Sequence, residues 1–165
     1  GRPIAANHSW ITTAASIYLA DVLNEACFRQ FPQVLPNSTT LVKLLESSVV
    51  SAQAYLVTFD IENMYPCIDN VAAIEACTRA VPSQRGMVHE LLSFVMHNGY
   101  CQNRGRYFKQ VKGTVTGTNV APPYANIYVA VALEAVVKQR VPYWPAIYKR
   151  FIDDGFFGKM RRLSR

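Results

Sequence analysis

Residues 151–157 read Phe151-Ile152-Asp153-Asp154-Gly155-Phe156-Phe157, so two adjacent aspartates stand between two apolar pairs. Asp and Gly are common in tight turns, whereas aromatic and β-branched residues are common in strands. The stretch therefore predicts a β-hairpin with Asp153-Asp154-Gly155 as its turn. The strand that enters the turn includes Ala146-Ile147-Tyr148, and the strand that leaves it includes Phe156-Phe157.

A third aspartate, Asp60, ends a second apolar run, Tyr55-Leu56-Val57-Thr58-Phe59, which predicts a buried strand. Adjacent ionised carboxylates repel one another and are costly to bury, so such a cluster is most stable where cations neutralise it. Carboxylate oxygens suit Mg²⁺, and two such ions about 3.5–4 Å apart support in-line phosphoryl displacement. Asp60, Asp153 and Asp154 therefore predict a site for two Mg²⁺ ions, with Mn²⁺ as a possible substitute.

From the carboxylates alone, a second interpretation stays open. Asp153-Asp154-Gly155 can be a solvated hairpin turn and Asp60 the start of a loop, because Asp and Gly are frequent in turns. Glu62 and Asp69 lie near Asp60 in sequence, and we interpret them as solvated turn carboxylates rather than metal ligands.

The remaining sequence predicts one mixed α/β unit in which helices pack on an antiparallel sheet. Apolar residues at helical spacing, capping residues and Gly or Pro breaks define the other elements. These are a helix from a Thr12 or Thr13 cap to about Gln30, a short helix capped by Ser38 or Thr39, helices over 71–80 and 86–98, a hairpin turn at 103–106, a glycine-bearing loop over 113–117 and a long apolar helix ending near Arg140.

The composition restricts the class of protein. The chain has 165 residues, half of them apolar, which is enough for one core, and its net charge of +6 suits an anionic partner of unspecified kind. The four cysteines are irregularly spaced and are expected as reduced core thiols. The apolar stretch 120–137 contains two prolines and a glutamate, which favours a buried helix of a globular protein over a membrane span. Because the chain opens Gly1-Arg2-Pro3 without Met, we expect a portion of a longer protein.

Three ordered segments resemble motifs A, B and C of reverse transcriptases. They are Phe59-Asp60-Ile61-Glu62-Asn63-Met64-Tyr65-Pro66, the stretch from Gly113-Thr114-Val115-Thr116-Gly117 to Asn126, and Lys149-Arg150-Phe151-Ile152-Asp153-Asp154. Together with Arg2-Pro3-Ile4, which looks like a fingers motif, they are most similar to Penelope-like reverse transcriptases and their telomerase relatives. The resemblance implies a polymerase palm over 53–165, preceded by partial fingers and connecting helices over 1–52, with fingers and thumb incomplete.

The resemblance also implies roles for individual residues. Asp60, Asp153 and Asp154 would hold the metal ions and catalyse transfer of a nucleotide to a primer 3′-hydroxyl. Tyr65 would lie beneath the sugar of the incoming nucleotide and exclude a 2′-hydroxyl. The other implied nucleotide contacts are Arg2, Ile61 and Gly117, and the implied template or primer contacts are Gly113, Thr116 and Ile152. The implied partners are an RNA template, a DNA primer and deoxynucleoside triphosphates, with no membrane, and the implied location is the nucleus.

Two positions depart from the family pattern. Thr116 stands where many reverse transcriptases have Gln, and Gly155 follows the aspartates where Penelope-like enzymes have an aliphatic residue. Neither change removes a metal ligand. Two alternatives stay open: a catalytically inactive, domesticated or truncated module that binds nucleic acid or protein, and RNA-directed RNA synthesis on the same palm. Without the resemblance, Tyr65 would be interpreted as a buried aromatic that supports the turn at Pro66.

Overall fold

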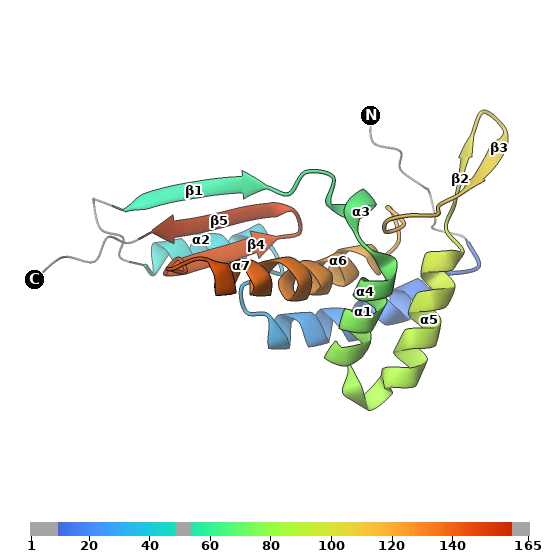
Figure 1. Ribbon diagram of the computed structural model, residues 1–165, viewed down its shortest axis with the longest axis horizontal. Coiled ribbons are helices and arrows are strands. Elements are labelled where there is room, and N and C mark those ends of the chain that lie inside the picture. Colours follow the sequence, from blue (N-terminus) through green and yellow to red (C-terminus); the bar gives the residue numbers. More distant parts are fainter. Residues whose placement is uncertain (1–9, 49–53, 160–165) are drawn as a thin grey trace, which may run out of the picture.

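The computed structural model describes residues 10–48 and 54–159, in which a small antiparallel sheet lies along one side of a group of helices (Figure 1). This architecture confirms the predicted mixed fold. The elements are α1 (Thr13–Gln30), α2 (Ser38–Glu46), β1 (Tyr55–Asp60), α3 (Met64–Cys67), α4 (Asn70–Ala80), η1 (Pro82–Gln84), α5 (Arg85–His97), β2 (Tyr100–Asn103), β3 (Arg106–Lys109), α6 (Ala121–Tyr128), η2 (Val129–Glu134), α7 (Ala135–Arg140), β4 (Ile147–Phe151) and β5 (Asp154–Lys159).

The main sheet has three antiparallel strands in the order β1-β5-β4. The prediction of a buried strand over 55–59 was wrong, since Tyr55 and Leu56 are 66% and 56% exposed. The reason is that β1 lies at the edge of the sheet, where a strand has a neighbour on one side only. Packing improves toward its end, where the Phe59 ring stacks on Tyr148 with 6.1 Å between ring centroids.

The core lies among the helices. Helices α1, α4, α5 and α6 pack against one another, and the side chains that they bury completely include Leu19, Leu23, Cys77, Leu92 and Ile127. Tyr124 of α6 is also buried, and its hydroxyl lies 3.2 Å from the Asn70 backbone oxygen at the start of α4. These four helices therefore form the packed core, and the sheet lies along one side of the helices (Figure 1).

Two helix caps differ from the expectation. Thr12 precedes α1 but makes no capping bond with its side chain; instead, the backbone N–H of Trp10 donates to Thr13 Oγ1 at 2.9 Å. Helix α2 is capped by Asn37, whose Oδ1 accepts from the Thr40 N–H at 2.9 Å, so the predicted Ser38 or Thr39 cap was wrong by one or two residues. Asn caps helices as well as Ser or Thr does, and sequence alone does not separate neighbouring candidates.

The long apolar helix changes its hydrogen-bonding pattern partway along. It runs as α6, passes through the π-helical segment η2 and continues as α7 (Figure 1). A π-helical turn changes which side chains share a face. Helix α6 buries most of its residues, whereas α7 buries none of its own, and Val131 and Leu133 of η2 are exposed. The prediction of a buried helix is therefore confirmed for its first half only.

The cysteine prediction is confirmed at Cys27 and Cys77, which are buried free thiols, and burial raises the pKa of Cys27 to about 11. It was wrong at Cys67, which is exposed at the end of the short surface helix α3. The side chain of Cys101 lies outside the part of the chain that the structure describes.

None of the helices in residues 10–48 and 54–159 combines the length and the apolar character needed to cross a membrane.

Candidate active site

The sheet register brings Asp60 and Asp154 directly opposite each other on β1 and β5. One residue further on, the N–H of Ile61 donates to the carbonyl of Asp153 at 3.0 Å. This pattern makes Asp60 and Asp154 a non-hydrogen-bonded pair, the kind in which the Cα atoms are about 4.5 Å apart and the side chains are closest. Asp153 precedes Asp154 in the turn. The three predicted aspartates therefore lie at the same end of the sheet, two of them as a cross-strand pair.

The aspartate pair lies on the open face of the sheet. Residues paired across antiparallel strands point to the same side, and successive residues alternate. Asp60, Asp154 and Phe151 are paired in register and all three are exposed. The opposite face carries Arg150 and Gly155, which are buried toward the helices. A substrate can therefore approach the two carboxylates from solvent while the helices support the strands from behind.

The turn between β4 and β5 lies one residue earlier than predicted. It consists of Ile152 and Asp153, and Asp154 already pairs with Phe151. Ile152 has a φ of 56°, the left-handed conformation that two-residue hairpin turns require but that β-branched residues avoid. Such a residue costs about 1–3 kcal/mol and persists only where its surroundings hold it in place.

A buried arginine holds that turn, a role that the sequence did not predict. The Arg150 side chain is 0% exposed, and its Nη1 donates to the carbonyl of Ile152 at 2.7 Å and to Asn126 Oδ1 at 2.7 Å. Its Nε donates to Glu134 Oε1 at 2.6 Å, and Nη2 donates to the Asn126 carbonyl at 3.0 Å. Arg150 therefore connects the turn that carries Asp153 to α6 and η2. The only local signal was a charged residue inside an apolar strand.

Tyr65 lies between the turn and the glycine-bearing loop. It lines an open pocket of about 270 Å³, whose other lining residues are Thr116, Gly117, Thr118, Asn119, Ala121 and Pro122. The side chain is half-buried, and burial, with a smaller contribution from the charge of Asp153, raises the pKa of Tyr65 to about 12. The phenol is therefore protonated at neutral pH, and the carboxylate of Asp153 is close enough for its charge to act on the hydroxyl.

Gly113 fixes the loop against the helix that carries Tyr65. Its φ is 77°, and a Cβ at this position would lie 2.7 Å from both the Tyr65 carbonyl oxygen and the Pro66 Cα. The next N–H, of Thr114, donates to the Tyr65 carbonyl at 2.9 Å, and Asn70 Nδ2 donates to the Gly113 carbonyl at 2.9 Å. The structure thus gives Gly113 a packing role, and its contact with template or primer stays a prediction.

The other predicted site residues are placed as follows. Thr116 and Gly117 line the Tyr65 pocket, and Ile61 and Ile152 are half-buried against the core. Arg2 lies outside the described residues. Asp69 caps α4 by accepting from the Ala72 N–H at 3.0 Å, which accounts for its carboxylate without a metal. Glu62 is exposed, as expected of a turn residue.

Metal binding stays a prediction. Within residues 10–48 and 54–159, no three His, Cys, Asp or Glu side chains lie close enough together to hold a metal ion as they stand. The chemistry of the donors nevertheless fits Mg²⁺, which binds few carboxylates and takes the rest of its ligands from water and phosphate. The cross-strand pair of Asp60 and Asp154 supplies two such carboxylates side by side.

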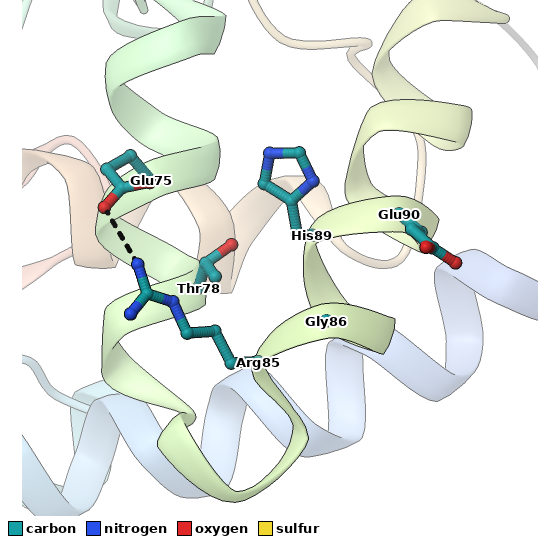
Figure 2. A pocket seen from close by; sticks show the side chains of 6 residues that line it. All are labelled: Glu75, Thr78, Arg85, Gly86, His89 and Glu90. Atoms are coloured by element: carbon teal, nitrogen blue, oxygen red, sulfur yellow. Dashed lines mark ion pairs between the residues drawn. The ribbon is translucent and has the colours of Figure 1, made fainter.

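A larger pocket, of about 460 Å³, lies between α4 and α5 (Figure 2). Its lining residues are Glu75, Thr78, Arg85, Gly86, His89 and Glu90. Arg85 reaches across from α5 to Glu75 on α4, with 3.7 Å between Nη2 and Oε1 (Figure 2). None of the lining residues belongs to the sheet or to the glycine-bearing loop, so we place the candidate active site at the aspartates.

Comparison with solved structures agrees with a fold of the reverse-transcriptase type. The chain is similar to telomerase from Candida albicans in complex with a TWJ fragment of telomeric RNA (9% identity, TM-score 0.67, 94% of this chain and 31% of that one). It is also similar to apo telomerase from Candida tropicalis (14% identity, TM-score 0.65, 94% and 32%) and to a form truncated from the C-terminal domain (12% identity, TM-score 0.64, 94% and 35%).

At these identities the likeness shows the fold alone: the chain has a telomerase- and reverse-transcriptase-like fold. It spans about a third of the length of the telomerases that it matches. No protein-family model and no curated protein matches the sequence.

Proposed function

We propose that the chain forms the palm, over 53–165, and part of the fingers, over 1–52, of a Penelope-like RNA-directed DNA polymerase. The observation that carries the proposal is the cross-strand pair of Asp60 and Asp154, with Asp153 in the adjoining turn and its charge acting on Tyr65. A fold of this type supports many functions, so the proposal depends on these side chains rather than on the fold.

The chemistry follows from where the residues lie. Asp60, Asp153 and Asp154 would hold two Mg²⁺ or Mn²⁺ ions. When bound, these ions would activate the primer 3′-hydroxyl and neutralise the charge of the leaving pyrophosphate. The open face of the sheet leaves space for the primer end and the triphosphate. The Tyr65 pocket, at about 270 Å³, is below the roughly 300–1,000 Å³ of sites that enclose a whole small molecule, so it suits a sugar or a base.

Tyr65 would select the sugar. Its ring is half-buried at the pocket wall and its phenol is protonated at neutral pH, so it presents a bulky neutral group to the nucleotide. A 2′-hydroxyl would meet that ring, which favours deoxynucleotides over ribonucleotides. For the same reason, we favour DNA synthesis over RNA-directed RNA synthesis on this palm.

An RNA template and a DNA primer are the partners that fit. The net charge of +6 suits an anionic partner, and one structural neighbour is a telomerase in complex with telomeric RNA. Copying into chromosomal DNA would take place in the nucleus, which is the location we propose.

The test is primer extension on an RNA template by the proposed full-length polymerase, of which this chain would form the palm. Asp154→Asn should lower extension by at least about 100-fold, the scale of losing one electrostatic contact at a reacting centre, for deoxynucleotides and ribonucleotides alike. Asp21→Asn, at an exposed carboxylate on α1, is the matched control and should leave the rate unchanged. Equal rates for Asp154→Asn and wild type would support the non-catalytic binding module instead.

A further inference from the structure

The β2–β3 hairpin projects away from the body of the molecule beyond α5 (Figure 1). It and the residues that follow carry four cations, Arg104, Arg106, Lys109 and Lys112, and no acidic residue between 99 and 112. Such a projection has little to contribute to the core. Four unopposed positive charges on it create a local field that attracts polyanions.

Aromatic side chains accompany these charges at the surface. Tyr107 is 71% exposed and Phe108 is 49% exposed. A group of neighbouring exposed apolar side chains, unlike a single one, marks a candidate interaction surface. Their location beside cations, rather than among other apolar groups, is typical of surfaces that bind single-stranded nucleic acid, where bases stack on rings and cations meet phosphates.

The strand register places Tyr100 and Tyr107 on one side of the hairpin and Phe108 on the other. Tyr100 pairs with Lys109 and Gln102 with Tyr107, so Tyr100, Tyr107 and Lys109 share one face of the hairpin. Trp10 extends the row at the base, with 5.9 Å between its ring centroid and that of Tyr100. The Trp10 Nε1–H donates to the Asn98 carbonyl at 3.0 Å, which fixes the orientation of the indole. We call Trp10, Tyr100, Tyr107 and Lys109 the hairpin surface.

The base of the hairpin is tied to the candidate active site. The N–H of Gln110 closes the hairpin by donating to the Gly99 carbonyl at 2.9 Å, and its side-chain Nε2 donates to the Thr114 carbonyl at 3.0 Å. Thr114 in turn donates to the Tyr65 carbonyl. The hairpin is therefore anchored at the loop that lines the Tyr65 pocket. A nucleic-acid strand bound to the hairpin would lie at a fixed distance from that pocket.

We propose that the hairpin surface, flanked by Arg104 and Arg106, binds a single-stranded segment of the nucleic acid that the candidate active site copies or extends. The proposal rests on the proposed function for the identity of the strand. Stacking on Tyr107, Tyr100 and Trp10 holds the bases, and the cations hold the phosphates without reading the sequence. An acidic protein would be attracted by the same charges but would gain nothing specific from a row of flat rings.

The test measures binding of the whole 165-residue chain to fluorescein-labelled U20 and dT20 by fluorescence anisotropy, in EDTA and without nucleotide. Tyr107→Leu keeps an apolar side chain but removes the ring, and affinity should fall roughly 5- to 150-fold with the salt dependence unchanged. Tyr107→Phe keeps the ring and should bind as wild type does. Equal affinity of the Leu variant and wild type would overturn the inference.

The cations are tested by their salt dependence. Replacing Arg104, Arg106 and Lys109 together by Gln should reduce the slope of log affinity against log salt by about two, because each neutralised phosphate of a single strand contributes about 0.7. Lys43→Gln, at an exposed cation on α2, is the matched control and should leave the slope unchanged. An equally large reduction of the slope in the Lys43 variant would mean that binding is spread over the whole surface. If a fully duplex RNA binds as well as U20 and is weakened equally by Tyr107→Leu, the bases do not stack on the ring. Either result counts against the hairpin surface.

The two proposals fail separately. Asp154→Asn should keep wild-type affinity for U20 in EDTA, since the hairpin surface needs no metal. Loss of extension in Asp154→Asn together with unchanged binding in Tyr107→Leu would leave the polymerase proposal standing and remove the hairpin surface. Weakened binding in Tyr107→Leu together with full extension by Asp154→Asn would do the reverse.

Discussion

Two hairpins of this molecule share a local geometry and differ in what surrounds them. The β4–β5 hairpin turns through Ile152, and the β2–β3 hairpin turns through Arg104 and Gly105, all three in the left-handed conformation. Behind Ile152 lies the buried Arg150 and its four hydrogen bonds to Asn126, Glu134 and Ile152. Arg104 and Gly105 are both exposed, and a Cβ on Gly105 would meet nothing within 4 Å.

The difference shows two ways to hold a tight turn. Arg104-Gly105 forms because Gly tolerates a positive φ, so its turn is encoded locally. Ile152 resists its conformation, and its turn forms because the packed surroundings impose it. A turn of the second kind is set by contacts with the helices, which suits a site whose carboxylates must be held in one place.

The largest expected effect is the loss of stability when Arg150, the buried cation behind the β4–β5 turn, is replaced. Arg150→Met should lower the free energy of unfolding by about 3–5 kcal/mol, because the buried Glu134 carboxylate loses its cationic partner and keeps only the neutral donors Gln33 and Tyr148. Arg106→Met makes the same change on the projecting hairpin and should cost less than about 0.5 kcal/mol, as exposed substitutions usually do. Urea unfolding of both variants gives the comparison. Equal losses would mean that the two hairpins are held in the same way.

A control separates lost charge pairing from lost packing. The double variant Arg150→Met with Glu134→Gln removes the unpaired charge, and it should recover part of the stability lost by Arg150→Met alone. If the double variant is no more stable than the single one, the hydrogen bonds to Asn126 and Ile152 account for the loss, rather than the ion pair.

Two glycines with positive φ provide the next comparison. Gly113→Ala should cost about 2–4 kcal/mol, since it adds overlap with the backbone of Tyr65 and Pro66 to the strain of a left-handed Ala. Gly105→Ala carries the strain alone and should cost about 1–2 kcal/mol. The measurement is again the midpoint and slope of urea unfolding. A loss at Gly105 as great as that at Gly113 would show that the close approach to α3 contributes little.

Tyr65 and Tyr107 should differ in what they select. In the proposed full-length polymerase, Tyr65→Ala should raise ribonucleotide relative to deoxynucleotide incorporation by about tenfold for each 1.4 kcal/mol of steric penalty relieved. Tyr107→Ala should leave that ratio unchanged and raise the concentration of template needed for half-maximal rate. Single-nucleotide extension with dGTP and GTP measures the ratio. Parallel losses with both nucleotides in Tyr65→Ala would make Tyr65 a packing residue.

The smallest expected effect is a change in the pKa of the Tyr65 phenol. The pKa of Tyr65 is about 12, raised first by burial and then by the charge of Asp153, so Asp153→Asn should lower it toward the ordinary value near 10 by the smaller of the two contributions. The ultraviolet difference spectrum between each protein and its Tyr65→Phe counterpart isolates this phenol. Because the folded-state pKa is the higher one, the contribution of Tyr65 to stability is complete below about pH 10 and is lost between about pH 10 and 12. An unchanged Tyr65 pKa in Asp153→Asn would show that the charge of Asp153 does not act on the Tyr65 phenol.

The sequence by itself determined the elements whose signals are local. Apolar periodicity located α1, α4 and α5 to within about a residue, and Asn103-Arg104-Gly105-Arg106 located the projecting turn. The order of the three motifs also indicated which aspartates belong together. These signals work because helix periodicity and Gly-containing turns depend on residues that are adjacent or one helical turn apart.

Only the tertiary structure decided how those parts meet. The register that sets Asp60 opposite Asp154 joins residues far apart in the sequence, and the turn moved to Ile152-Asp153 because Arg150 satisfies the Ile152 carbonyl from beneath the sheet. Gly113 gained its role from the approach of a distant helix, and β1 lost its expected burial because it became an edge strand. Burial, register and close approach depend on which distant segments pack together, and no local pattern in a single sequence specifies that.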